Sequence, residues 1–150
     1  MSLQQWLDDN LIHQARPTPD EVQSLLAVSR REIADAAVQG ISLDGRFEHA
    51  YESVRSAAQA ALLAEGFAVP RHAERGHEVL IRSLAHTVGL EVGKVDYLDI
   101  CRRSWEKVKY ERSGLVQRAE ADRLLREAPD VLEHVKAWLA ERHPELSRRR

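Results

Sequence analysis

Apolar side chains recur every three or four residues along most of the chain, which is the spacing of α-helices that bury one face. No stretch of four residues alternates between apolar and polar side chains as a half-buried β-strand does. The predicted helices cover residues 2–13, 18–40, 44–66, 76–88, 92–110 and 117–142. The pattern therefore predicts one all-α domain, residues 1–150, built as an antiparallel four-helix up-and-down bundle. A short extra N-terminal helix precedes the bundle core of residues 18–142, and a frayed basic tail, residues 143–150, follows it.

The ends of these helices carry recognisable signals. Ser2 with Gln5, and Thr18 with Glu21, have the spacing of capping boxes, in which side chains satisfy free backbone N–H groups of a first helical turn. Pro129 lies inside the last helix, where it removes one backbone hydrogen bond, so we expect the C-terminal helix to be kinked.

The composition is that of a globular protein, with 43% apolar and 31% charged residues. The 22 basic and 24 acidic side chains give a net charge of −2, which argues against attraction of nucleic acid over the whole surface. A single cysteine, Cys101, excludes an internal disulfide and a cysteine-rich zinc site. The sequence shows neither an apolar run of about 20 residues nor a signal-peptide pattern. We therefore expect a cytoplasmic protein that does not act at a membrane.

The usual motifs of metal sites and of nucleophilic catalysis are missing from the sequence. No two histidines lie one helical turn apart with a carboxylate nearby, and His72 and His77 are interpreted as solvated loop side chains or helix caps. Cys101 falls on an apolar helix face, where cysteine behaves as a small hydrophobe. Neither Gly-x-Ser-x-Gly nor a phosphate-binding glycine loop is present. We expect no metal and no cofactor.

The helix that contains YLDICRRSWEKVKY, residues 97–110, is the main candidate for a functional element. At about 100° per residue, one stripe along it is apolar and is predicted to lie in the core or at a subunit interface. The stripe consists of Leu98, Cys101, Trp105 and Val108. The charged and polar positions beside or opposite the stripe are Arg102, Arg103, Glu106, Lys107, Lys109 and Tyr110. Their plainest interpretation is a solvated face with pairs such as Arg102 and Glu106.

Three segments of the chain share the pattern of a known family. They are SLLAVSRREIADAAVQGISLDGRFEHAYESVRSAAQAALLAEGF, GHEVLIRSLAHTVG and YERSGLVQRAEADRLL. Their most specific positions are Asp44, Arg46, Ala50, Tyr51, Gly76, His77, Leu80 and Tyr110–Gly114. Over residues 18–139 the chain resembles the HEPN superfamily (higher eukaryotes and prokaryotes nucleotide-binding), in particular its small stand-alone bacterial members.

The resemblance implies a bundle of four or more helices that commonly forms a homodimer with a groove between late helices. Many HEPN proteins are metal-independent ribonucleases, and often toxins partnered by a small nucleotidyltransferase. Their motif is an arginine, a polar residue, and a histidine or tyrosine about five residues beyond the arginine. The arginine can hold the scissile phosphate while the last residue assists proton transfer.

Alignment of the motif through YERSG places Trp105 at the arginine position, Glu106 at the polar position and Tyr110 at the last position. Tryptophan cannot stabilise phosphate charge, and a glutamate repels a phosphodiester. Tyr110, with an ordinary pKa near 10, is a poor base at neutral pH on its own. Arg102 or Arg103 would have to replace the missing arginine. The resemblance thus implies a degraded ribonuclease centre.

Three hypotheses follow from this departure. The first is a dimeric accessory protein that has kept the fold and lost catalysis, with a nucleotidyltransferase or a toxin–antitoxin system as its context. The second is a metal-independent ribonuclease toxin with a rearranged catalytic site of Arg102, Arg103 and Tyr110. The third is a nucleotide or RNA binder without turnover. The candidate nucleotide- or RNA-binding residues are Lys107, Lys109 and Arg112. In the second hypothesis Lys107 and Lys109 complete a site drawn from two subunits, and in the third Arg112 and the basic tail lie near the phosphate.

Overall fold

The computed structural model describes residues 2–110 and 114–148, which are helical apart from short connections and one pair of two-residue strands. The helices are α1 (Leu3–Asp8), α2 (Pro19–Ala36), α3 (Leu43–Ala64), α4 (Gly76–Arg82), α5 (Leu84–Thr87), α6 (Val92–Tyr110), α7 (Arg118–Arg142) and the 3₁₀ turn η1 (Pro144–Leu146). The strands are β1 (His13–Gln14) and β2 (Phe67–Ala68). The predicted helical fold class is confirmed.

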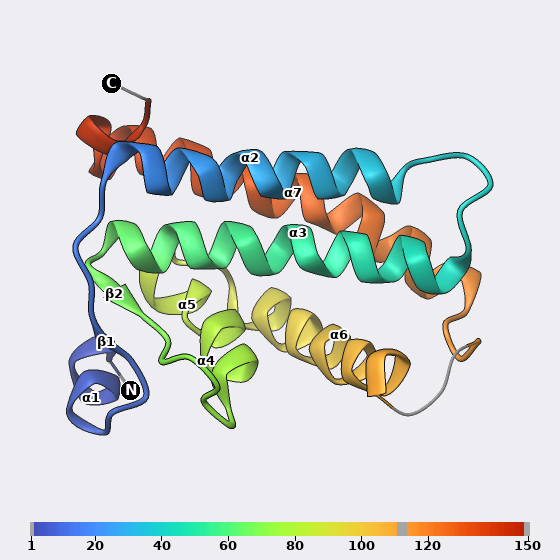
Figure 1. Ribbon diagram of the computed structural model, residues 1–150, viewed down its shortest axis with the longest axis horizontal. Coiled ribbons are helices and arrows are strands. Elements are labelled where there is room, and N and C mark those ends of the chain that lie inside the picture. The colour runs from blue at the N-terminus through green and yellow to red at the C-terminus, as the bar shows by residue number, and fades with distance from the viewer. Residues whose placement is uncertain (1, 111–113, 149–150) are drawn as a thin grey trace.

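Helix α3 is the central element of the fold. It contacts α2, α7, α4 and α6, and Figure 1 shows α2 running beside it in the opposite direction, with α7 behind the pair. Helix α3 can be surrounded in this way because many of its inward side chains are small. Its buried alanines are Ala50, Ala57, Ala58, Ala60, Ala61 and Ala64.

Buried serines join α2 to α3. The Ser29 hydroxyl donates a hydrogen bond to the carbonyl oxygen of Ser53 at 2.9 Å, and the Ser56 hydroxyl donates to that of Leu25 at 2.7 Å. Because these hydroxyls are bonded, their burial leaves no unpaired polar atom between the helices. The small side chains also let the two backbones approach closely.

The helix starts follow the predicted capping signals. The Ser2 side chain accepts from the Gln5 amide at 3.2 Å, while the Gln5 side chain accepts from the Ser2 amide at 2.9 Å, which completes the capping box. Thr18 accepts from the Glu21 amide at 3.2 Å, but the Glu21 carboxylate accepts from the Thr18 hydroxyl at 3.0 Å and not from the Thr18 amide, so the second predicted capping box is only half formed. Ser42, which the sequence analysis did not single out, caps α3 by accepting from the Gly45 amide at 2.9 Å.

Three predicted helices differ from those observed. The first ends at Asp8, because Asn10 adopts the left-handed conformation that terminates helices. The single helix expected at residues 76–88 is two, α4 and α5, separated at Ser83, whose hydroxyl donates to the carbonyl of Leu80 at 2.6 Å and so competes with the regular helical bonds. The helix expected at residues 18–40 ends earlier, at Ala36, whereas α7 runs to Arg142 with Pro129 inside it, as predicted.

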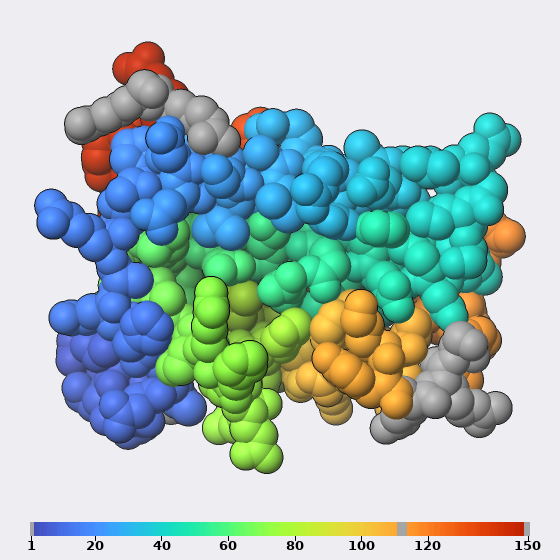
Figure 2. All heavy atoms as spheres, in the orientation of Figure 1, coloured from blue at the N-terminus to red at the C-terminus, as the bar shows by residue number. Residues whose placement is uncertain are grey.

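Strands β1 and β2 attach the N-terminal segment to the end of α3. They pair antiparallel, with His13 opposite Ala68 and Gln14 opposite Phe67. Two residues are too few for an alternating pattern, which is why the sequence did not predict them. Figure 2 shows the segment after β2 and α4, in light green, projecting between the N-terminal segment and α6.

No helix in residues 2–110 or 114–148 is both long and apolar enough to cross a membrane.

Candidate functional site

Trp105 lies at the centre of an aromatic cluster formed by three helices. Its ring centroid is 4.9 Å from that of Tyr51 on α3 and 5.0 Å from that of His77 on α4, with interplanar angles of 28° and 21°. These are stacked arrangements, which add to the energy of apolar burial. Trp105 is only 5% exposed, so it packs inward as its spacing predicts and holds α6 against α3 and α4.

His77 and Tyr51 are also joined by a hydrogen bond between the Tyr51 hydroxyl and His77 Nδ1, at 3.2 Å. Burial raises the pKa of Tyr51 far above its usual value, so the phenol stays protonated. Burial, together with the nearby Arg55 charge, lowers the pKa of His77. The imidazole is therefore neutral at pH 7, and its Nδ1 can accept the hydrogen bond from the Tyr51 hydroxyl.

A groove of about 880 Å³ lies beside this cluster. Its walls come from α2, α3, the segment around β2 and the start of α4, and Tyr110 at the end of α6 contributes to the lining. Arg55, Gln59 and His77 supply cationic and polar groups on one side, whereas Asp20 and Glu21 supply carboxylates from α2. The groove can therefore hold a ligand of mixed polarity with one anionic end.

Arg102 is the first of the predicted catalytic residues, and the structure places it in two ion pairs. Its Nε donates to Asp99 at 2.7 Å and its Nη1 donates to Glu106 at 3.0 Å. Asp99 is buried and is also bonded by Arg82 at 3.1 Å. The Arg102 side chain is 12% exposed, so it braces α6 and is not presented to a ligand.

The other predicted site residues are distributed around the end of α6. Tyr110 is 75% exposed, and its ring stands edge-on to Trp105 at 6.2 Å. Lys109 Nζ lies 5.8 Å from the Trp105 ring centroid. Arg103 and Lys107 are exposed, and in the described part of the chain they make no ion pair. Arg112 lies outside the described residues.

The residues predicted for a subunit interface lie mostly in the core of the chain itself. Leu98, Cys101 and Trp105 are buried, and Val108 is half-buried. The first three therefore have almost no surface left for a second subunit. Burial raises the pKa of Cys101 to about 11, so its thiol is protonated and unreactive at neutral pH.

Sequence reasoning missed Arg55, Gln59 and the role of His77. It treated His77 as a solvated loop residue, although the structure places the ring against Trp105. A signal was present, because Tyr51, Arg55 and Gln59 are each four residues apart and form a polar row on a largely apolar helix. Such a row on a buried helix indicates that a polar site lies against it.

The groove holds no set of metal ligands among the residues that the structure describes. Within residues 2–110 and 114–148, one group of side chains could bind a metal ion: Glu32 and Asp35 on α2 with His49 on α3. None of these three residues lines the groove.

Comparison with protein-family models gives no match for this chain, and a search of curated proteins returns no significant relative.

Proposed function

We propose that this chain is a HEPN-like accessory protein that acts by binding and does not cleave RNA. In this proposal α2, α3, α6 and α7 correspond to the four-helix up-and-down bundle of that superfamily. Support comes from the all-helical fold and from the state of the residues at the ribonuclease motif positions. The resemblance supplies the context, a nucleotidyltransferase-type partner in a toxin–antitoxin system.

The observation that carries the proposal is the burial of Trp105 against Tyr51 and His77. At the position where the family motif has a phosphate-binding arginine, this chain has a core side chain. Arg102, three residues earlier on α6, does not replace it in this proposal, because its guanidinium is already held in ion pairs with Asp99 and Glu106. Freeing Arg102 for a phosphate would leave Asp99 as a buried carboxylate with fewer partners, which is energetically costly.

The homodimer remains part of the proposal, but with other contact residues. Four exposed apolar side chains lie on α6 or beside its end and are better placed than the buried stripe: Val92, Ile100, Tyr110 and Leu115. Single exposed apolar residues are common on monomers, so the resemblance carries most of this expectation. Sedimentation velocity at micromolar concentrations distinguishes dimer from monomer, and monomer alone would remove this part.

Expression of the chain in a bacterial host tests the lack of toxicity. Cells that express it are expected to grow as fast as cells with an empty vector, because Trp105 stands at the motif's arginine position and Arg102 is held by Asp99 and Glu106. Growth curves at matched expression levels measure this. Arrest that is relieved by Tyr110→Phe or Arg103→Ala would support the ribonuclease hypothesis instead, and arrest that both variants retain would point to toxicity unrelated to these residues.

A second candidate, the nucleotide binder, is favoured by the groove itself. Arg55 and Gln59 lie in its wall and can donate hydrogen bonds to a phosphate, while the exposed Tyr110 ring offers a face for a base. Arg55 is paired with Glu52, and the carboxylates of α2 disfavour a second anionic group. These charges favour a mononucleotide over a long RNA strand.

Calorimetric titration with a nucleoside monophosphate tests this second candidate. Loss of a charge-assisted hydrogen bond in Arg55→Ala is expected to weaken binding by about 10-fold or more. Arg126→Ala is the matched control, since Arg126 is exposed on α7 and does not line the groove. Absence of binding to the unaltered chain, or equal weakening in both variants, would remove the candidate.

A further inference from the structure

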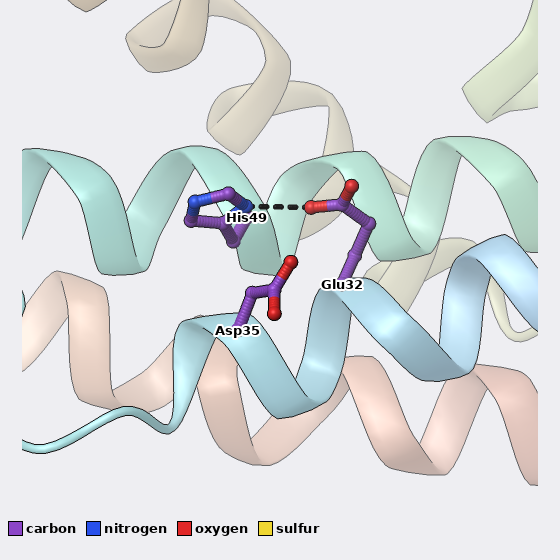
Figure 3. Close-up of side chains that lie close together, drawn as sticks. All are labelled: Glu32, Asp35 and His49. Carbon is purple, nitrogen blue, oxygen red and sulfur yellow. Dashed lines mark hydrogen bonds and ion pairs between the residues drawn. The ribbon is translucent and has the colours of Figure 1, made fainter.

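We propose that Glu32, Asp35 and His49 form a binding site for a divalent transition-metal ion of the zinc type. One ligand atom from each residue lies within 4.8 Å of the others. Glu32 and Asp35 come from successive turns of α2, and His49 comes from the facing side of α3. In Figure 3 the Asp35 carboxylate points towards the hydrogen bond between His49 and Glu32. This site is independent of the proposed function, because none of the three residues lines the groove.

The geometry requires only small side-chain movements to surround an ion. Ligands at zinc distances of about 2.0–2.2 Å in a tetrahedral arrangement lie about 3.3 Å apart. His49 Nδ1 and Glu32 Oε2 are already 2.6 Å apart, so an ion entering between them must separate these atoms slightly while Asp35 moves in. To bind the metal through Nδ1, the imidazole must release the proton that it donates to Glu32, so that hydrogen bond is lost and the proton passes to solvent.

The present partners of the cluster leave room for a cation. The Asp35 carboxylate makes no hydrogen bond or ion pair within residues 2–110 and 114–148. Glu32 is bonded by His49 and by Arg31, whose side chain is 62% exposed and can turn into solvent at little cost. The Glu32 side chain is only 12% exposed, so its charge is weakly screened by water. Two carboxylates facing one imidazole leave an excess of negative charge that a divalent ion neutralises.

The donor set selects the class of metal. An imidazole nitrogen with two carboxylate oxygens suits zinc and neighbouring transition metals, whereas magnesium and calcium prefer six or more oxygen ligands. Three protein ligands leave a further coordination position for water. An ion held here would connect α2 to α3 directly.

Isothermal titration of zinc chloride into the full-length, untagged chain tests the site. We expect one zinc ion per chain and no measurable binding of magnesium or calcium. At zinc concentrations about 100 times the Kd, the Tm is expected to rise by roughly 5–10 °C. Asp35→Asn is the cleanest variant, because it removes a ligand without breaking a contact within the described residues, and it is expected to weaken binding at least tenfold.

Two further variants make the result decisive. His49→Gln is expected to abolish the Tm increase. His143→Gln is the matched control, because His143 also contacts two carboxylates, Glu65 at 3.2 Å and Glu145 at 3.6 Å, but lies outside the proposed site. Zinc binding that survives Asp35→Asn and His49→Gln, or that is lost equally in His143→Gln, would overturn the proposal, as would no binding at all.

Discussion

Replacement of Trp105 by alanine is expected to lower the free energy of unfolding by about 3–5 kcal/mol, the usual cost of deleting a large buried aromatic side chain. Trp105 contacts rings from two other helices, Tyr51 on α3 and His77 on α4, so its loss opens a cavity where three helices meet. This is a large share of the stability of a typical domain, about 5–15 kcal/mol. Urea denaturation followed by circular dichroism measures the change.

Two control substitutions separate this role from a general effect of tryptophan. Trp105→Phe keeps an aromatic ring and removes the buried Nε1–H, which has no hydrogen-bond partner within the described residues, so we expect a loss below about 1.5 kcal/mol. Trp138→Ala removes a half-buried tryptophan near the C-terminal end of α7 and is expected to cost less than Trp105→Ala. Equal costs for Trp105→Ala and Trp138→Ala would show that Trp105 is not a core residue.

Substitution of Asp99 by asparagine is expected to cost about 2–4 kcal/mol at pH 7, because it leaves Arg102 and Arg82 without their shared buried carboxylate. Asparagine has nearly the same shape, so the loss reports on charge. Glu106→Gln is the matched control, since Glu106 pairs with the same arginine but is half-exposed, and it is expected to cost less than about 1 kcal/mol.

The cost of the Asp99 substitution is expected to depend on pH. Burial alone would raise the pKa of Asp99, but hydrogen bonds and charge from Arg102 and Arg82 outweigh it and lower the pKa below its ordinary value of 3.8. A carboxyl group with a lowered pKa stabilises the fold above the ordinary pKa, and this contribution is lost as the pH falls through the lowered value. Denaturation curves for wild type and Asp99→Asn should therefore begin to approach each other below about pH 4 and meet only once the pH is below the lowered pKa. A difference that persists unchanged to pH 3 would contradict this assignment.

Much of the helical framework could be predicted from the sequence because its signals are local. The bounds of α6, and the start of α2 at Thr18 and Pro19, follow from apolar spacing and capping residues. The separation of α4 from α5 at Ser83 could not be predicted, because the serine hydroxyl bonds within its own turn only when the chain is folded there. Pairing of β1 with β2 joins segments more than fifty residues apart, which no local pattern encodes.

The candidate site likewise has features that a single helix determines and features that depend on how helices pack together. The helical spacing predicted that Trp105 points inward and that Arg102 lies near Glu106, since both depend on one helix alone. The stack with His77 and the pairing of Arg82 with Asp99 depend on how α4 packs against α6. The meeting of His49 with Glu32 likewise depends on the register of α2 against α3. Sequence alone does not supply these distances between helices.

Incubation of the purified chain with labelled RNA in the presence of a metal chelator measures whether the α6 motif still cleaves. We expect no cleavage above that of a protein-free sample, and no difference between wild type, Tyr110→Phe and Arg103→Ala. In the proposed alignment the buried Trp105 replaces the phosphate-binding arginine, and Arg102 is held by Asp99 and Glu106. Circular dichroism of each preparation verifies that the chains are folded. Chelator-resistant cleavage by wild type that disappears in Tyr110→Phe would contradict the proposal that this protein binds without cutting.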